Sequence, residues 1–92
     1  MPGIPKHGKR DLNEGDIKKA LIAVGAAIVP LSIKGVPDLL VGFRGINYLL
    51  EIKGDDGKLT DDEFTFFEIW EGQCCVVRTP EEALKAIGAI NA

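Results

Sequence analysis

The stretch Tyr-Leu-Leu-Glu-Ile-Lys, residues 48–53, decides the fold because it places two charges in an otherwise apolar run. Successive side chains of a β-strand point to opposite faces, so Leu49, Glu51 and Lys53 share one face if the run is a strand. A charged group on a mostly buried strand costs free energy unless a partner compensates it. The run therefore predicts a core strand with an acid and a lysine projecting together.

A second acid, Asp38, ends the segment Gly-Val-Pro-Asp at residues 35–38. Residues 38–43 have the pattern of another strand, and residues 44–47 form a tight connection to the strand at 48–53. The two strands are therefore predicted to pair as a hairpin. In such a hairpin Asp38, at the start of its strand, lies beside the end of the partner strand.

The chemistry of this arrangement favours a metal site. The carboxylates of Asp38 and Glu51 would repel each other, and a hard divalent cation relieves that repulsion. We expect them to hold Mg²⁺ or Mn²⁺ with a backbone carbonyl near Ile52, and Lys53 to orient a nucleophile or neutralise developing charge. Simpler interpretations stay open: a solvated edge strand, a structural Glu51–Lys53 ion pair, or an Asp38 that only shapes a turn.

The whole chain predicts an α/β fold, a small mixed β-sheet flanked by helices in the order α-β-β-β-α-β-α. The expected elements are a helix at 13–24, strands at 26–32, 38–43 and 48–53, a helix at 60–71, a strand at 74–78 and a helix at 79–88. The second helix opens with a capping box of Thr60 and Glu63, and its buried stripe is expected to be Phe66, Phe67 and Trp70.

Length and composition limit what the chain can be. Ninety-two residues, 46% hydrophobic and 27% charged, predict one domain over 1–92 with its own core. No apolar run is long enough for a membrane span, and the basic N-terminus lacks the apolar segment of a signal peptide, so an intracellular protein is expected. So small a domain gains stability from a partner subunit.

Charge is distributed unevenly along the chain. The net charge is −3, yet residues 1–53 hold eight Lys or Arg against five Asp or Glu, whereas residues 54–92 hold three against nine. The first half could therefore face a phosphate backbone, although scattered surface charge explains the pattern equally well. Residues 1–11, with two prolines and two glycines, are expected to form a flexible basic arm.

The two cysteines, Cys74 and Cys75, are adjacent in the sequence. A disulfide between neighbours needs unusual backbone geometry, and no other cysteine is available as a partner. They lie in an apolar run that predicts a buried strand, where free cysteine packs well. A redox or metal-binding thiol pair is the alternative, and it requires exposed, reactive thiols.

Two motifs in order, Gly-Val-Pro-Asp-Leu-Leu-Val-Gly at 35–42 and Tyr-Leu-Leu-Glu-Ile-Lys-Gly at 48–54, resemble those of the PD-(D/E)XK nuclease superfamily. More narrowly, the chain resembles the stand-alone VRR-NUC domain of phage and bacterial proteins. Gly-Lys-Leu-Thr at 57–60, Trp-Glu-Gly-Gln at 70–73 and Val-Val-Arg at 76–78 extend the likeness. The resemblance covers about residues 13–88 and implies a restriction-endonuclease-like fold.

The resemblance also implies further site residues. Glu14 matches an acid on the first helix that helps bind a metal, although it can equally serve as a first-turn acid. Glu63 stands where many relatives have glutamine, so it either joins the site or only completes the cap. Thr79 replaces the second arginine of the family's name, which puts a phosphate contact by Arg78 in doubt.

The function implied is a divalent-metal-dependent DNA endonuclease, structure-selective for branched or Holliday-junction-like DNA, acting as a homodimer in the cytoplasm of a bacterial or phage-infected cell. The alternative is a non-catalytic DNA-binding or assembly module that retains the nuclease fold. In either case basic side chains would contact the DNA backbone. The candidates are Lys9, Arg10, Lys18, Lys19, Lys34, Arg44 and Arg78.

Overall fold

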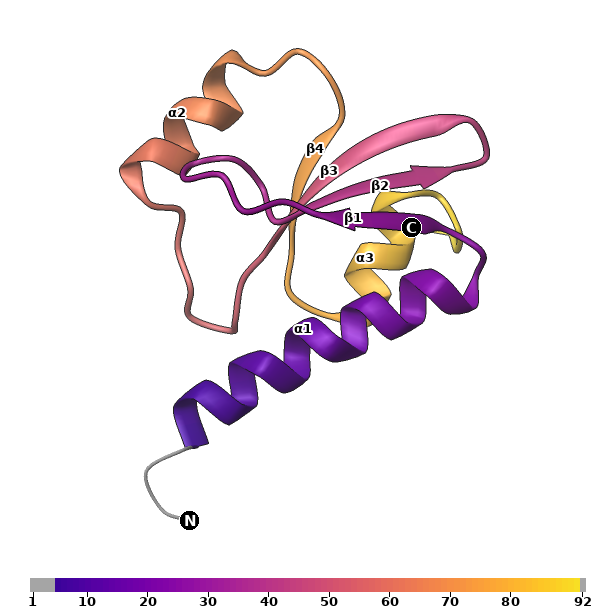
Figure 1. The fold of residues 1–92 in the computed structure, drawn as a ribbon, viewed down its shortest axis with the longest axis horizontal. Helices are drawn as coiled ribbons and strands as arrows, with labels where there is room; N and C mark the ends of the chain where they lie inside the picture. Colours follow the sequence, from indigo (N-terminus) through magenta and orange to yellow (C-terminus); the bar gives the residue numbers. More distant parts are fainter. Residues whose placement is uncertain (1–4, 92) are drawn as a thin grey trace.

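The computed structural model describes the backbone of residues 5–91 and the side chains of residues 13–91. The chain folds in the predicted order α-β-β-β-α-β-α (Figure 1). The elements are α1 (Pro5–Ala23), β1 (Ala27–Pro30), β2 (Leu39–Phe43), β3 (Ile46–Ile52), α2 (Asp61–Ile69), β4 (Cys74–Val77) and α3 (Pro80–Ala86). The predicted α/β class with a small mixed sheet is confirmed.

The sheet has the strand order β1-β2-β3-β4. Strands β1, β2 and β3 pair antiparallel, whereas β4 pairs parallel to β3 because α2 makes the crossover between them. Phe43 pairs with Ile46, which leaves only Arg44 and Gly45 in the hairpin loop. Both have positive φ, 52° and 83°, as a type I′ turn requires. So short a loop fixes the β2–β3 register.

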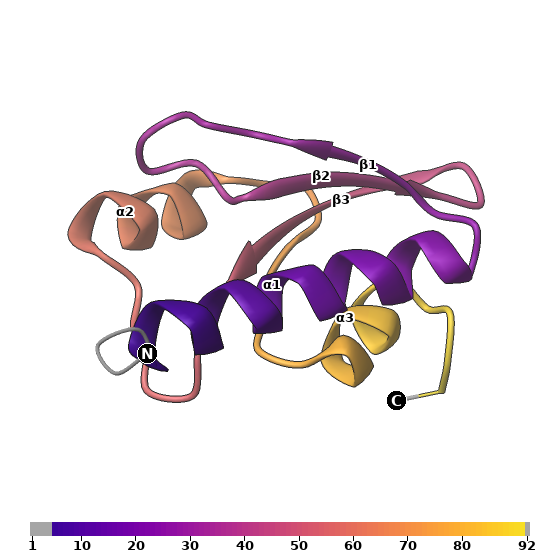
Figure 2. The ribbon, with the colours of Figure 1, turned by 60° about the horizontal axis from the view of Figure 1, so that its bottom comes forward.

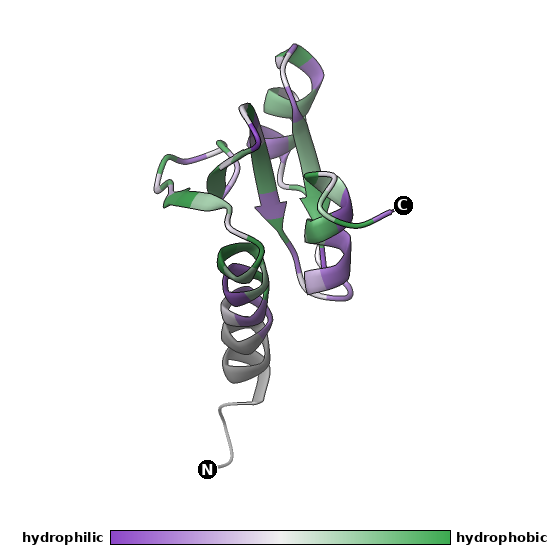
Figure 3. Ribbon diagram, turned by 90° about the vertical axis from the view of Figure 1, so that its right-hand side faces the viewer, coloured by the Kyte–Doolittle hydropathy of each residue, from purple (hydrophilic) through white to green (hydrophobic). Residues whose placement is uncertain are grey.

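Helices α1 and α3 cover one face of the sheet, and the core lies between them and the strands (Figure 2). Ile17 and Leu21 of α1 are fully buried there against inward-facing residues such as Val41 and Leu50. Figure 3 shows that hydrophobic residues dominate the strands and the end of α1 next to the sheet. Helix α2 lies at one end of the sheet, away from the β2–β3 turn (Figures 1 and 2).

The first helix begins earlier than the sequence predicted. Helix α1 starts at Pro5, so the backbone of residues 5–11 is helical where the sequence predicted part of a basic arm. Proline is favoured in the first helical turn, where its missing N–H is not needed. Residues 1–4, and the side chains up to residue 12, lie outside the described part of the chain. Within that part, no helix is long and apolar enough to cross a bilayer.

Helix α2 opens as predicted but packs differently. Thr60 accepts a hydrogen bond from the Glu63 N–H, and Glu63 accepts one from the Thr60 N–H, which confirms the capping box. The predicted buried stripe is wrong. Phe66 and Phe67 are only half-buried, and 46% of Trp70 is exposed. The reason is the placement of α2 at the end of the sheet, where no second layer covers it.

We predict that Leu21→Ala lowers the free energy of unfolding by about 3 kcal/mol, because it removes buried methyl groups and leaves a cavity. The neighbouring Ile22 is 59% exposed, so Ile22→Ala is the matched control and should change that free energy by less than about 1 kcal/mol. Urea unfolding followed by circular dichroism measures both. Equal losses in the two variants would contradict the packing of α1 described above.

Candidate active site

The β2–β3 register brings the two predicted acids together. Leu39 pairs with Leu50, and both face the core. One residue farther out, the same register sets Asp38 opposite Glu51, on the face of the sheet away from α1 and α3. Directly opposed residues of an antiparallel pair have Cβ atoms about 5 Å apart. The short hairpin thus places two carboxylates that are distant in sequence side by side.

A hydrogen bond holds the side chain of Asp38 at the end of β3. Its Oδ2 accepts from the Ile52 N–H at 2.8 Å. Carrying the strand register outward sets Pro37 opposite Ile52, and proline has no N–H to donate to the Ile52 carbonyl. On the β4 side, the ladder continues instead through Lys53, whose N–H donates to the Val77 carbonyl. The Ile52 carbonyl oxygen therefore has no donor from β2.

Glu51 is the most deeply buried acid in the described part of the chain, with 1% of the residue exposed. Its Oε2 lies 3.4 Å from Lys53 Nζ, whereas its buried Oε1 has no hydrogen-bond partner. Burial, together with the neighbouring carboxylates of Asp38 and Glu63, raises the pKa of Glu51 to about 7 even though the Lys53 ammonium acts to lower it. A buried oxygen without a partner is the kind of ligand a cation would satisfy.

Lys53 is also buried, and it contacts two acids. Its Nζ lies 2.8 Å from Glu63 Oε1, closer than it lies to Glu51. Burial lowers the pKa of Lys53, but the ion pairs with Glu63 and Glu51 outweigh burial and raise the pKa above its ordinary value. The ammonium group therefore stays charged at neutral pH. The sequence left open whether Glu63 joins the site or only completes the helix cap, and in the structure it does both.

Glu14 does not join this cluster. It pairs with Lys18 at 3.2 Å on the partly exposed side of α1. In the described residues, no three side chains of the types His, Cys, Asp and Glu gather closely enough to hold a metal ion. The oxygens available are those of Asp38 and Glu51 and the Ile52 carbonyl. Two carboxylates, a carbonyl and waters fit Mg²⁺ or Mn²⁺, which commonly keep several waters in protein sites.

Asn13, rather than Glu14, links α1 to the site. Its side-chain Nδ2 donates to the carbonyl of Lys53 at 3.2 Å, across 40 residues of sequence. This bond anchors the end of β3 to the helix on the other side of the sheet. No periodicity or motif signals it, because a single asparagine near a helix start is ordinarily a cap.

The predicted DNA-contacting residues are dispersed. Lys34 lies in the loop before β2, and its Nζ is 3.6 Å from Oδ2 of Asp62 in α2. Arg44 stacks over the ring of Phe43 in the hairpin turn, at the far end of β2 from Asp38. Lys18 is engaged by Glu14, and Lys19 is exposed on α1. The side chains of Lys9 and Arg10 lie outside the described part of the chain.

Arg78 has a structural role. Its Nη1 donates to the carbonyls of Gly54 and Asp55, in the loop that follows Lys53. Its own N–H donates to Glu82 Oε1 at 2.7 Å, while the N–H of Glu82 donates to the Thr79 hydroxyl at 3.0 Å. The end of β4 is thereby tied to the end of β3.

The cysteines do not have the properties of reactive thiols. Cys74 and Cys75 are half-buried and are not bonded to each other. Burial, followed by the charges of its neighbours, raises the pKa of Cys74 to about 11, and burial raises the pKa of Cys75 as well. The thiolate is the reactive form, so a raised pKa disfavours redox and metal chemistry at neutral pH.

The electrostatics of Glu51 predict an unusual dependence of stability on pH. The folded chain holds a proton on Glu51 up to about pH 7, whereas the unfolded chain releases it near the ordinary glutamate pKa of 4.5. The free energy of unfolding of the metal-free protein should therefore fall as pH rises between these values, by on the order of 3 kcal/mol. Glu51→Gln should remove this slope, and Glu71→Gln, at an exposed position, should keep it. Urea unfolding in the presence of a chelator, from about pH 4.5 to about pH 8, measures this dependence on pH. Equal slopes in the parent and in Glu51→Gln would contradict the prediction.

Comparison with models of protein families gives no match, and comparison with curated proteins gives none either. A solved structure described as a VRR_NUC domain is similar to this chain, with a TM-score of 0.73 and 25% sequence identity. The similarity covers 86% of this chain and 94% of that one. The resemblance in sequence and the similarity in structure agree, and the chain has the nuclease fold of a VRR-NUC domain.

Proposed function

We propose that this protein is a divalent-metal-dependent endonuclease that hydrolyses phosphodiester bonds in DNA. One observation carries the proposal: the pairing of Asp38 with Glu51 beside a buried Glu51 oxygen that has no partner. A structural ion pair alone would need only Glu51 and Lys53 and gives no reason for a second carboxylate, that of Asp38, beside Glu51. The nuclease fold supports the same chemistry.

The residues then take distinct roles. Asp38, Glu51 and the Ile52 carbonyl would hold Mg²⁺ or Mn²⁺. When bound, such an ion acidifies a water and stabilises charge on a phosphate. Lys53 would face the developing negative charge with an ammonium that is already desolvated and positioned. The hydrogen bond from Ile52 keeps the Asp38 carboxylate oriented before any substrate arrives.

The proposed substrate is branched DNA of the Holliday-junction type, cut by a homodimer with two active sites. A domain of this size has little surface for reading bases, which favours recognition of DNA shape. Symmetric cuts need two sites, and a two-fold dimer supplies them.

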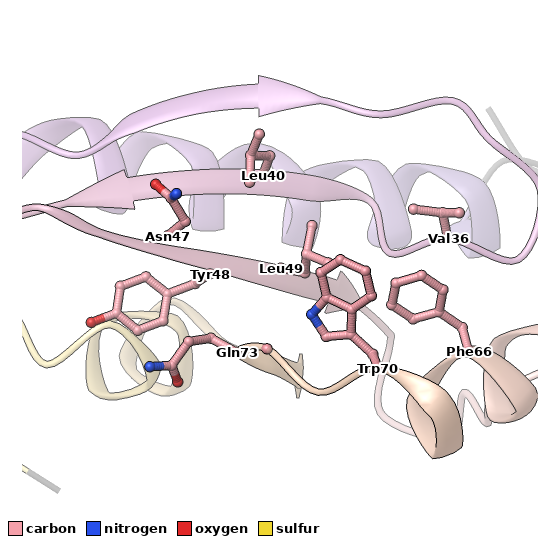
Figure 4. A pocket seen from close by; sticks show the side chains of 9 residues that line it. Val36, Leu40, Asn47, Tyr48, Leu49, Phe66, Trp70 and Gln73 are labelled. Atoms are coloured by element: carbon pink, nitrogen blue, oxygen red, sulfur yellow. The ribbon is translucent and has the colours of Figure 1, made fainter.

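The open face of the sheet supports the dimer and is its proposed interface. Cross-strand partners Val29 and Leu40 are 51% and 37% exposed on this face, and Leu40 pairs in turn with Leu49. Next to them, the rings of Trp70 and Phe66 stack with their centroids 5.0 Å apart and line a groove of about 420 Å³ (Figure 4). Soluble monomers rarely leave such apolar rows uncovered. A second copy of the chain would cover them.

We predict that Asp38→Ala and Lys53→Ala each lower the rate of cleavage of a four-way junction at least about 100-fold, because the first removes a metal ligand and the second removes the ammonium that faces the developing charge. Asp56→Ala, in the exposed loop after β3, is the matched control and should cut like the parent. Cleavage is measured on junctions and supercoiled plasmid with Mg²⁺ or Mn²⁺. Full activity in both site variants would overturn the assignment.

Calorimetry separates the enzyme from a DNA-binding module with the same fold. The parent should bind Mn²⁺, and Glu51→Gln should bind it at least about tenfold more weakly. Equal uptake by the two proteins, together with DNA binding that needs no metal, would favour the non-catalytic module.

We predict a dimer by light scattering at tens of micromolar protein. Leu40→Glu should shift it to monomer, because the substitution places a charge in the middle of the proposed apolar interface. Ile22→Glu is the control, since Ile22 is also exposed but lies on α1, behind the sheet. A monomeric parent, or equal effects of the two variants, would rule out this interface.

A further inference from the structure

The ammonium group of Lys53 forms ion pairs with two acids that lie on different elements of the fold. Glu51 extends from the same strand, whereas Glu63 reaches in from the first turn of α2. The shorter contact is to Glu63, 2.8 Å against 3.4 Å. The side chain of Glu63 is also shielded, with 16% of it exposed. An ion pair so placed is screened by water far less than one on the open surface.

The carboxylate of Glu63 is itself held in place. Its Oε1 accepts both the Lys53 ammonium and the N–H of Thr60, the latter at 2.9 Å. The backbone N–H of Glu63 donates to the Thr60 hydroxyl at 3.2 Å. The oxygen that contacts Lys53 is therefore fixed by the start of a helix. A lysine has a flexible four-carbon stem, so a fixed acceptor decides where its ammonium group lies.

We propose that Glu63 is the positioning residue for Lys53, and that it keeps the ammonium group in place when Glu51 serves as a ligand. This inference rests on the proposed function, in which Glu51 gives its oxygens to a cation. A carboxylate engaged in that way is a weaker partner for Lys53, and Glu63 is the acid that remains. Because Glu63 belongs to the first turn of α2, the position of the Lys53 ammonium group depends on the formation of that helix.

The competing explanation is that Glu63 only caps α2, and Thr60 offers a matched control. Thr60→Ala removes one hydrogen bond of the same capping box and leaves the contact between Glu63 and Lys53 intact. Both Thr60→Ala and Glu63→Ala weaken the cap and should lower the melting temperature. Only Glu63→Ala removes the acceptor of the ammonium group.

The first measurement is turnover of a four-way junction at saturating metal and substrate. Glu63→Ala should lower kcat about 10- to 100-fold, as loss of a supporting contact commonly does, with little change in KM. Thr60→Ala should lower kcat no more than about threefold. Glu63→Gln keeps an oxygen acceptor for both donors and should restore kcat to within about threefold of the parent. Equal losses in Glu63→Ala and Thr60→Ala would overturn the proposal.

The second measurement needs no activity and separates this proposal from the proposed function. In metal-free protein, the side-chain NMR signal of the Lys53 ammonium should exchange with water slowly in the parent, in Glu63→Gln and in Thr60→Ala, and rapidly in Glu63→Ala. If the parent cuts no DNA but this pattern holds, the nuclease function fails and the positioning role stands. If the exchange rate is the same in all four proteins, the positioning role fails. Should Glu63→Ala not fold, Glu63→Asp, whose shorter side chain pulls the acceptor away, takes its place.

Discussion

The opposite charges of Glu51 and Lys53 are buried next to each other at the sheet, and the surrounding residues offset part of the cost of burying them. Removing a carboxylate and an ammonium from water costs several kcal/mol for each, and their mutual attraction repays the cost only when further hydrogen bonds are available. Lys53 obtains a second acceptor from Glu63, whereas Glu51 keeps one oxygen without a partner. The ammonium is therefore satisfied within the chain, and the carboxylate is not. This asymmetry supports the proposed cation site over an ordinary structural ion pair.

The same constraint explains the hairpin. A shift of one residue between β2 and β3 would turn every side chain of one strand to the opposite face. Asp38 would then face the core, and Leu39 would take its place opposite the acid. The two-residue turn at Arg44 and Gly45 prevents this shift, because its positive φ angles match the twist of the strands. A turn at one end of the sheet thus sets the geometry of carboxylates at the other.

The sequence was sufficient for the order of elements and for the grouping of Asp38, Glu51 and Lys53, since both follow from local patterns. The alternation around Glu51 and Lys53, the cap at Thr60 and the turn residues are each confined to a few positions. The exposure of Trp70 was not predictable in this way. Helical spacing identifies an apolar stripe, but whether anything covers the stripe depends on where the helix lies relative to the sheet.

Two other features depended on long-range placement. The bond from Asn13 to the Lys53 carbonyl joins positions that only the finished fold brings together, and nothing in the sequence around Asn13 distinguishes it from a cap. Glu14 illustrates the converse. It lies on the helix where the resemblance places an acid, yet its carboxylate contacts Lys18, one turn away on the same helix.

Helix α2 has no fully buried residue, and charged contacts at Glu63 and Asp62 help to hold its first turn against the rest of the domain. Apolar burial is insensitive to ionic strength, whereas attraction between partly exposed charges weakens as salt is added. Of the two contacts, only the exposed pair of Asp62 with Lys34 is open to such screening, whereas the shielded pair of Glu63 with Lys53 is not. Added salt should therefore loosen α2 at Asp62 while the contact that positions the lysine persists.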